Sequence, residues 1–180
     1  TTTRAYLELH LAVFLWGFTA ILGDLIQLSA LTLVWWRVFL TSLSLVAAIR
    51  ITTLYKEVGR PQLLRLVGIG LLTGLHWVAF YGSIKLANAS IALICMATTS
   101  RFSSLLEPLI VKSPFRWIEL ILGLFILPGI WLVAEGSADS MNLGILVGLV
   151  SAFLAALFTN LNKRYMGNTD AMRVTFIELG

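Results

Sequence analysis

The chain has 180 residues, of which 58% are hydrophobic and 12% are charged, with 13 Lys and Arg against 9 Asp and Glu. Ordinary soluble domains carry about 25% charged residues, and a soluble globule of this size could not bury so much apolar surface. A disordered chain is excluded because it would be poor in apolar residues, and a disulfide scaffold because Cys95 is the single cysteine. The composition indicates an integral membrane protein.

Six apolar segments are long enough to cross a bilayer as helices, which takes about 20 residues at about 1.5 Å each. They are expected at Tyr6–Leu28, Ala30–Ile49, Leu63–Ile84, Ala87–Val111, Trp117–Ala134 and Leu143–Leu161. A seventh apolar run opens near Ala171 and continues to Gly180. The connections are short apart from Arg50–Gln62, so neighbouring helices should be antiparallel. We therefore predict an all-α polytopic membrane helix bundle with six spans and the start of a seventh.

Basic residues collect in alternate connections of this arrangement, with Lys85 alone on the opposite side. Cytosolic loops carry the excess of Lys and Arg in membrane proteins. The pattern predicts a plasma-membrane protein with a cytosolic amino terminus and a lipid environment, and it argues against nucleic acid as a partner despite a sequence pI near 9.6. The basic residues on the predicted cytosolic side are Arg4, Arg50, Lys56, Arg60, Arg65, Lys112, Arg116, Lys163, Arg164 and Arg173.

Arg101, near the centre of the fourth predicted span, is a candidate binding residue. A central arginine costs about 2.5–3.5 kcal/mol on insertion scales, so it should face the bundle interior or a wet cavity. Either Arg101 anchors an anionic group of a solute, or it forms an internal ion pair. Of the two candidate partners, Glu107 and Glu178, Glu178 is the more interesting one. Thr98 belongs to a run of hydroxyl residues in the same span, which either packs helices closely or lines a path.

Aromatic residues at mid-depth are the other candidates. In the third span, His76 and Phe80 are four residues apart, as are Trp77 and Tyr81, so each pair should lie on one helix face. Such a group suits a cavity for a mixed polar and apolar solute, or it packs helices together around a satisfied histidine. Trp16 and Trp77 lie too deep for the interfacial aromatic belt to explain them.

Small residues and prolines suggest where helices cross or break. Gly70 with Gly74, and Gly144 with Gly148, form GxxxG steps, which permit close helix crossing. Pro108 and Pro128 are expected to interrupt the fourth and fifth spans, and broken helices often lie near transporter sites. The sequence has no HExxH, GxSxG or Walker motif, so neither covalent chemistry nor ATP-driven transport nor a cofactor is expected.

Several stretches of the chain share a family pattern in their order and spacing. They are the Trp-Gly of LAVFLWGFTAILGDLI, the Arg of LVWWRVFL, the junction YGSIKLANASIALICMATTSRFSSLLEPLI and the paired glycines of LGLFILPGIWLV. Over about residues 10–135 the chain resembles an EamA-type member of the drug/metabolite transporter superfamily. That family has two inverted five-helix repeats. The resemblance implies a first repeat at residues 1–135 and the start of the second at 140–180, so a fragment or truncated form is expected.

The resemblance further implies a secondary transporter that exports or exchanges small metabolites, such as amino acids, by alternating access. The first, third, fourth and sixth spans are expected to line the path, and a homodimer is left open. The alternative is a non-transporting polytopic membrane protein, either an assembly subunit or an intramembrane enzyme. The predicted solute contacts are Trp16, His76, Trp77, Tyr81, Thr98 and Arg101.

Overall fold

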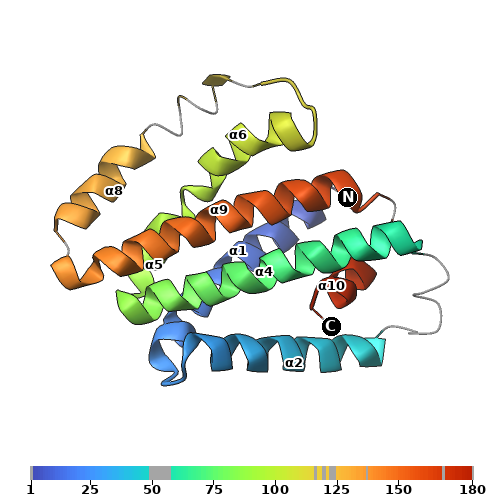
Figure 1. The fold of residues 1–180 in the computed structure, drawn as a ribbon, viewed down its shortest axis with the longest axis horizontal. Coiled ribbons are helices and arrows are strands. Elements are labelled where there is room, and N and C mark those ends of the chain that lie inside the picture. The colour runs from blue at the N-terminus through green and yellow to red at the C-terminus, as the bar shows by residue number, and fades with distance from the viewer. Residues whose placement is uncertain are drawn as a thin grey trace.

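The computed structural model describes residues 2–48, 58–115, 117–118, 121, 125–136, 138–167 and 169–179, and their regular structure is helical (Figure 1). The predicted all-α class is therefore confirmed for these residues. The helices are α1 (Thr2–Leu25), α2 (Ala30–Ala48), α4 (Arg60–Leu86), α5 (Ala89–Met96), α6 (Thr99–Ile110), α8 (Ile126–Glu135), the 3₁₀ helix η1 (Asp139–Met141), α9 (Asn142–Tyr165) and α10 (Ala171–Leu179).

Four stretches of the described chain are long and apolar enough to cross a membrane, namely Thr3–Leu25, Arg60–Leu86, Ala89–Ile110 and Asp139–Tyr165. They match the first, third, fourth and sixth predicted spans, and the shorter apolar helix Ala30–Val46 matches the second. The protein is thus a polytopic membrane helix bundle. The predicted fifth span, Trp117–Ala134, is described only in part, and Arg50, Lys56 and Arg116 lie outside the described residues.

Local sequence explains where α4 and α5 begin. Pro61 lies in the first turn of α4, where its missing N–H would have had no helical partner. Between α4 and α5, the side chain of Asn88 accepts a hydrogen bond of 2.9 Å from the Ile91 amide. This cap satisfies one of the amides that the start of a helix leaves without a partner, and α5 begins after only two connecting residues, Ala87 and Asn88.

The centre of the fold is the antiparallel pair of α4 and α9, which lie side by side in Figure 1. A Cβ atom added at Gly144 would lie 2.6 Å from the Ala87 Cβ, and one added at Gly148 would lie 2.7 Å from the Ser83 Oγ. The Gly144–Gly148 step is therefore a site of close helix approach, as predicted. The face of α9 that is buried consists of small residues: Gly144, Gly148, Ser151, Ala152, Ala155, Ala156 and Asn160.

Two apolar clusters lie along α4, with a polar stretch between them. Buried Thr73 and His76 occupy the stretch. The cluster toward the end of α4 joins α1, α2, α4 and α5 through Ala20, Leu33, Val34, Phe80, Tyr81, Ile84 and Ala92. The cluster toward its start joins α4 to α10 through Val58, Leu66, Ile69 and Val174, with Phe158 and Leu161 of α9 packed against it.

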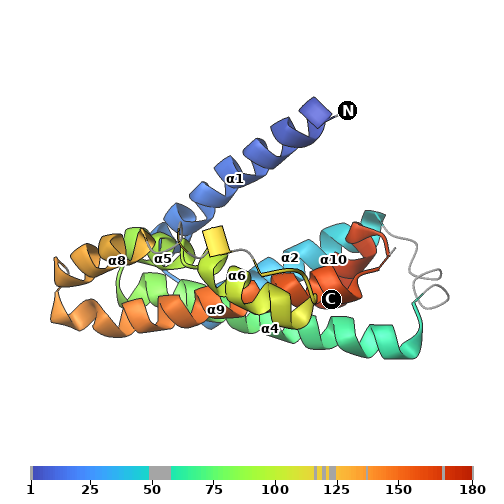
Figure 2. The same cartoon turned by 90° about the horizontal axis from the view of Figure 1, so that it is seen from above.

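Helix α1 meets the bundle only near its carboxyl end and diverges from it toward the amino terminus (Figure 2). A Cβ atom at Gly23 would lie 2.7 Å from the Tyr81 ring, so α1 and α4 touch there. Lys85 at the end of α4 donates a hydrogen bond of 2.6 Å to the carbonyl oxygen of Ile26. A cation suits this position because the last carbonyl groups of a helix carry partial negative charge.

The fourth predicted span is broken at Ala97–Thr98, between α5 and α6. The amide of Thr98 and its Oγ1 both donate to the Cys95 carbonyl oxygen, at 3.0 and 2.6 Å. These bonds tighten the chain into a 3₁₀-like turn, because a threonine hydroxyl competes for backbone carbonyl groups.

Pro108 does not interrupt its helix, so that prediction was wrong, whereas the prediction for Pro128 is not tested, because part of the fifth predicted span lies outside the described residues. Pro108 lies inside α6, two residues before its end, and Pro128 is the third residue of α8. A proline in the first turn of a helix removes no helical hydrogen bond. One near the last turn leaves few hydrogen bonds to disturb.

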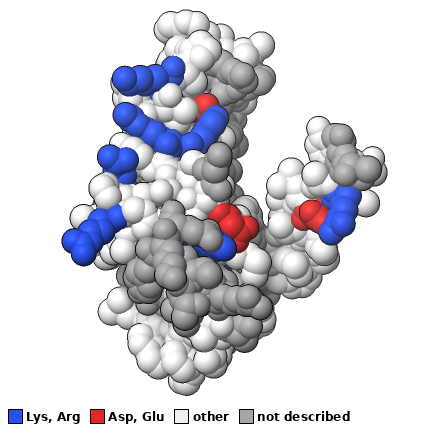
Figure 3. All heavy atoms as spheres, turned by 90° about the vertical axis from the view of Figure 1, so that its right-hand side faces the viewer, with Lys and Arg blue, Asp and Glu red and all other residues white. Residues whose placement is uncertain are grey.

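Basic side chains gather at one end of the bundle, where α4 begins and α6 and α9 end. Lys163 of α9 forms an ion pair of 2.7 Å with Glu107 of α6, and Arg164 donates to the carbonyl oxygen of Ile110 at 2.5 Å. Figure 3 looks onto this end and shows Lys and Arg side chains over it. The described basic residues near the start of α4 and the end of α9, which the sequence placed on one side of the membrane, therefore lie at one end of the structure.

The close approach at Gly144 predicts the outcome of two matched substitutions. Gly144→Ala should lower the thermal stability of the purified chain in detergent, because the new methyl group meets the Ala87 Cβ and the backbone of Leu86; overpacking of this kind costs about 1–3 kcal/mol. Gly74→Ala is the control, because nothing lies within 4 Å of a Cβ there. Equal melting temperatures for the two variants would contradict the close packing of α4 and α9.

Candidate solute-binding site

Trp77 and Tyr81 of α4 hold Arg37 of α2. The guanidinium carbon of Arg37 lies 4.5 Å from the centroid of the Trp77 ring, and its Nη1 donates a hydrogen bond of 2.8 Å to the Tyr81 hydroxyl. The spacing of four residues places the indole and the phenol on one face, as predicted. An arginine over an indole is favoured by the negative face of the ring, so these two aromatic residues bind a cationic side chain of the protein itself.

His76 lies on the neighbouring face of α4, against α9. Its Nδ1 is 2.9 Å from both the carbonyl oxygen and the Oγ of Ser151. The Ser151 hydroxyl also approaches the sulfur of Met96 in α5 at 3.7 Å. His76 stacks on Phe80 with 6.3 Å between ring centroids, which confirms that predicted pair. His76 therefore has hydrogen-bond partners on α9 in this conformation, and Ser151 extends the contact to α5.

Thr98 and Arg101 flank the turn between α5 and α6. Thr98 is buried, and its hydroxyl is bonded to the backbone of its own turn. Arg101 is in the first turn of α6 and partly buried, and its Nε and Nη2 are buried without a hydrogen-bond partner. The Oγ1 of Thr99 is also buried without a hydrogen-bond partner. Buried polar atoms normally have hydrogen-bond partners. The two arginine nitrogens at the start of α6 could therefore donate hydrogen bonds to an acceptor group that the described residues do not supply.

The predicted ion pair between Arg101 and Glu178 is not formed, so that prediction was wrong. The Oε2 of Glu178 accepts a hydrogen bond of 3.2 Å from the side-chain amide of Asn162. Its Oε1, like the two buried nitrogens of Arg101, has no partner. The pair was proposed from charge alone, and charge does not say which faces of two helices meet.

Trp16 lies apart from the other candidate residues. Its side chain is 67% exposed on α1, and a Cβ added at the adjacent Gly17 would meet nothing within 4 Å. The structure therefore brings together Trp77 with Tyr81 through Arg37, and it places Thr98 and Arg101 at one turn. It does not join these two groups to Trp16.

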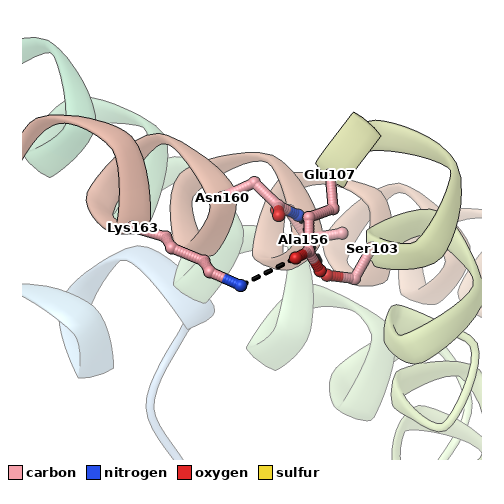
Figure 4. A network of polar contacts seen from close by, with 5 residues as sticks. All are labelled: Ser103, Glu107, Ala156, Asn160 and Lys163. Carbon is pink, nitrogen blue, oxygen red and sulfur yellow. Dashed lines mark hydrogen bonds and ion pairs between the residues drawn. The ribbon is translucent and has the colours of Figure 1, made fainter. Parts of the chain in front are cut away.

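A polar contact between α6 and α9 was missed by the sequence analysis (Figure 4). The Asn160 side chain donates to the Oγ of Ser103 at 2.9 Å and to the carbonyl oxygen of Ala156 at 2.8 Å. One turn further along, Lys163 reaches Glu107. The signal was present in the spacing, because Asn160 continues the small-residue face of α9 at intervals of three and four residues.

The described residues offer no group of three or more His, Cys, Asp or Glu side chains that could hold a metal ion. What they present is a set of hydrogen-bonding groups inside an apolar bundle. Such groups are costly in a membrane and usually mark the path of a solute or an ion.

Comparison with known proteins decides the family. The model of the EamA-like transporter family matches residues 3–134, which is most of the chain. The chain belongs to the EamA-like transporter family. This membership confirms the resemblance read from the motifs and places the protein among membrane transporters of the drug/metabolite transporter superfamily. No curated protein and no solved structure matches it significantly.

The two histidines of this EamA-like protein provide a matched test of the contact between α4 and α9. His76→Leu should lower the thermal stability in detergent, because it removes the hydrogen bond to Ser151; such bonds in membranes contribute about 0.6–2 kcal/mol. His10→Leu should leave stability unchanged, because His10 is exposed on α1 and bonded only within its own helix. A His76→Leu variant as stable as His10→Leu would show that the hydrogen bond contributes nothing.

Proposed function

We propose that this protein is a secondary transporter of the plasma membrane that exports or exchanges small metabolites, such as amino acids, by alternating access. The observation that carries the proposal is the family match, which extends from the start of α1 to the last turn of α8. The distribution of polar groups supports it. They lie on the faces where helices meet, whereas the large exposed side chains of α1 and α2 are mostly apolar.

The proposed solute contacts are Trp16, His76, Trp77, Tyr81, Thr98 and Arg101, and Arg101 has the strongest support. Its two buried nitrogens without partners suit an anionic group of the solute, such as a carboxylate, because charge-assisted hydrogen bonds to arginine are strong and directional. His76, Trp77, Tyr81 and Thr98 have hydrogen-bond or cation–π partners within the protein. A solute would reach them only after those partners move apart, as alternating access requires.

Residues 1–135 are proposed to be the first five-helix repeat, and residues 140–180 the beginning of a second, inverted repeat. Two features support this division. The family match ends at residue 134, and the short η1 helix separates α8 from α9. An odd number of spans in the first repeat would start the second from the opposite side of the membrane.

The basic end of the bundle is proposed to face the cytosol, together with the amino terminus. Arg60 and Arg65 at the start of α4 and Lys163 and Arg164 at the end of α9 support this orientation, because Lys and Arg are retained on the cytosolic side during insertion. Asp139 and Glu135 lie near the opposite ends of these helices. The proposed environment of the intervening helices is the lipid bilayer.

Transport itself tests the role of Arg101. Full-length protein in liposomes should catalyse exchange of labelled amino acids or related carboxylates, and Arg101→Gln should raise the half-saturating concentration about tenfold or more, since a hydrogen bond to a charged group contributes about 1.5–3 kcal/mol. Arg4→Gln is the control, because Arg4 is exposed and pairs with Glu8. Absence of exchange for any small solute would contradict the proposed function, and unchanged kinetics in Arg101→Gln would contradict the role of Arg101.

Labelling of single cysteines tests the orientation. In a Cys95→Ala background, a membrane-impermeant thiol reagent applied to intact cells should label Asp139→Cys and should label Arg60→Cys only after the membrane is opened. Both positions are exposed in the structure. The reverse pattern would place the basic end outside the cell and would contradict the orientation.

A further inference from the structure

Asn162 of α9 and Glu178 of α10 form a polar pair with unused hydrogen-bonding capacity. The Nδ2 of Asn162 donates a hydrogen bond of 3.2 Å to the Oε2 of Glu178. The other oxygen of each group, Oδ1 of Asn162 and Oε1 of Glu178, is buried and has no partner. Both orphaned atoms are acceptors when the carboxyl group is ionised. The pair therefore lacks a donor.

The pair is held where α10 packs tightly against α4. A Cβ atom at Gly70 would collide with the backbone of Glu178, so the two helices touch at these residues. Gly70 lies 10 residues after the start of α4, which is about 15 Å along the helix axis. A bilayer core is about 30 Å thick. Gly70 therefore lies within the core if α4 spans it, and the two orphaned oxygen atoms are buried within the protein itself, so bulk water does not satisfy them.

A single proton on Oε1 of Glu178 would supply the missing donor. The carboxylic acid then has one O–H donor beside one acceptor oxygen, and a primary amide has the complementary set. In the cyclic pairing of a carboxylic acid with a primary amide, the amide donates to one carboxyl oxygen, as it does here to Oε2, and the acid O–H donates to the amide oxygen, which would give both orphaned oxygens a partner. We infer that Glu178 and Asn162 form a proton-binding site of the transporter, occupied by a proton in the conformation described here.

Within the part of the chain that the structure describes, no Lys or Arg side chain forms an ion pair with the Glu178 carboxylate. Arg65 stacks over Tyr165 at 4.9 Å, Lys163 pairs with Glu107, and Arg37 bonds to Tyr81. Arg173 lies five residues before Glu178 on α10, about 140° away round the helix axis. The titratable residues described on α2, α4 and α9 are Arg37, Arg60, Arg65, His76, Tyr81, Lys85, Lys163, Arg164 and Tyr165. Asn162 is the hydrogen-bond partner recorded for Glu178.

The number of oxygen atoms favours a proton over a metal cation. Hard cations take about six or more oxygen ligands, whereas two orphaned oxygens are present here. No other acidic or metal-ligating side chain completes a metal-binding group among the described residues. A proton requires only the two oxygens.

If the protein is the proposed transporter, this proton site would couple solute movement to a proton gradient. That consequence, unlike the proton site itself, rests on the proposed function. Glu178 lies on α10, outside the family match at residues 3–134, and it holds α10 against both α4 and α9. Release of the proton would leave the Glu178 carboxylate facing one acceptor oxygen, Oδ1 of Asn162, and would favour separation of α10 from α9. A change in the packing of α10 on proton release would connect ion movement to the conformational cycle.

Infrared spectroscopy of the full-length protein in liposomes tests the proton without any transport. At neutral pH the wild type should show the carbonyl absorption of a protonated carboxyl group. Glu178→Gln should lose that band, and Glu135→Gln, which changes an exposed carboxyl group at the end of α8, should retain it. Glutamine keeps a donor toward Asn162, so Glu178→Gln should remain folded. Absence of the band in wild type, or its persistence in Glu178→Gln, would overturn the inference.

Transport tests the coupling separately. Under an imposed pH gradient the wild type should accumulate labelled solute. In Glu178→Gln this accumulation should fall at least tenfold, while solute exchange at equal pH is retained. Glu135→Gln should retain both activities. Unchanged pH-driven accumulation in Glu178→Gln, or accumulation driven by sodium alone, would overturn the inference. Absence of exchange in wild type would refute the proposed function instead, and the infrared result would still decide whether Glu178 carries a proton.

Discussion

The close antiparallel packing of α4 against α9 is the contact on which the rest of the described structure depends. In lipid, helices gain no hydrophobic free energy by meeting, so their association relies on van der Waals contact and hydrogen bonds between them. Gly144 and Gly148 let the backbones approach, and the bond between His76 and Ser151 adds a directional contact on the same seam. Helices α5, α6 and α10 then pack against this pair rather than mainly against one another.

Buried polar groups differ in whether they have hydrogen-bond partners, according to where they lie relative to this contact. Along the seam of α4 and α9 they have partners, as His76, Ser83 and Ser151 do. At α6 and α10, which flank the seam, buried polar atoms of Thr99, Arg101 and Glu178 have none. A protein selected for stability alone would not retain such groups in a membrane. They flank the closely packed pair of α4 and α9, where the proposed alternating access would let them exchange partners.

The helix break between α5 and α6 and the tight contact of α10 with α4 place these groups at helix junctions. At the break, the Thr98 hydroxyl bonds the Cys95 carbonyl oxygen, so a side chain replaces part of the regular backbone pattern. Irregular backbone in a membrane is tolerated where protein surrounds it or where it lines a cavity. The apolar surface of α1, by contrast, is almost wholly exposed, with 6% of its membrane-length window buried.

The sequence alone identified the four long apolar helices and the shorter α2, because hydropathy and length act residue by residue and need no partner. The placement of Lys and Arg along the sequence also predicted the basic end of the bundle, and ordered motifs in α1, α2, α4, α5, α6 and α8 indicated the family. Only the tertiary structure decided which hydrogen-bond partner each polar residue has. Hydropathy averages over a window, so it missed the break at Ala97–Thr98, where neither Gly nor Pro occurs. Which group meets Arg101, His76 or Glu178 depends on helix rotation and register, which the packing of small residues on α9 sets and which no single segment encodes.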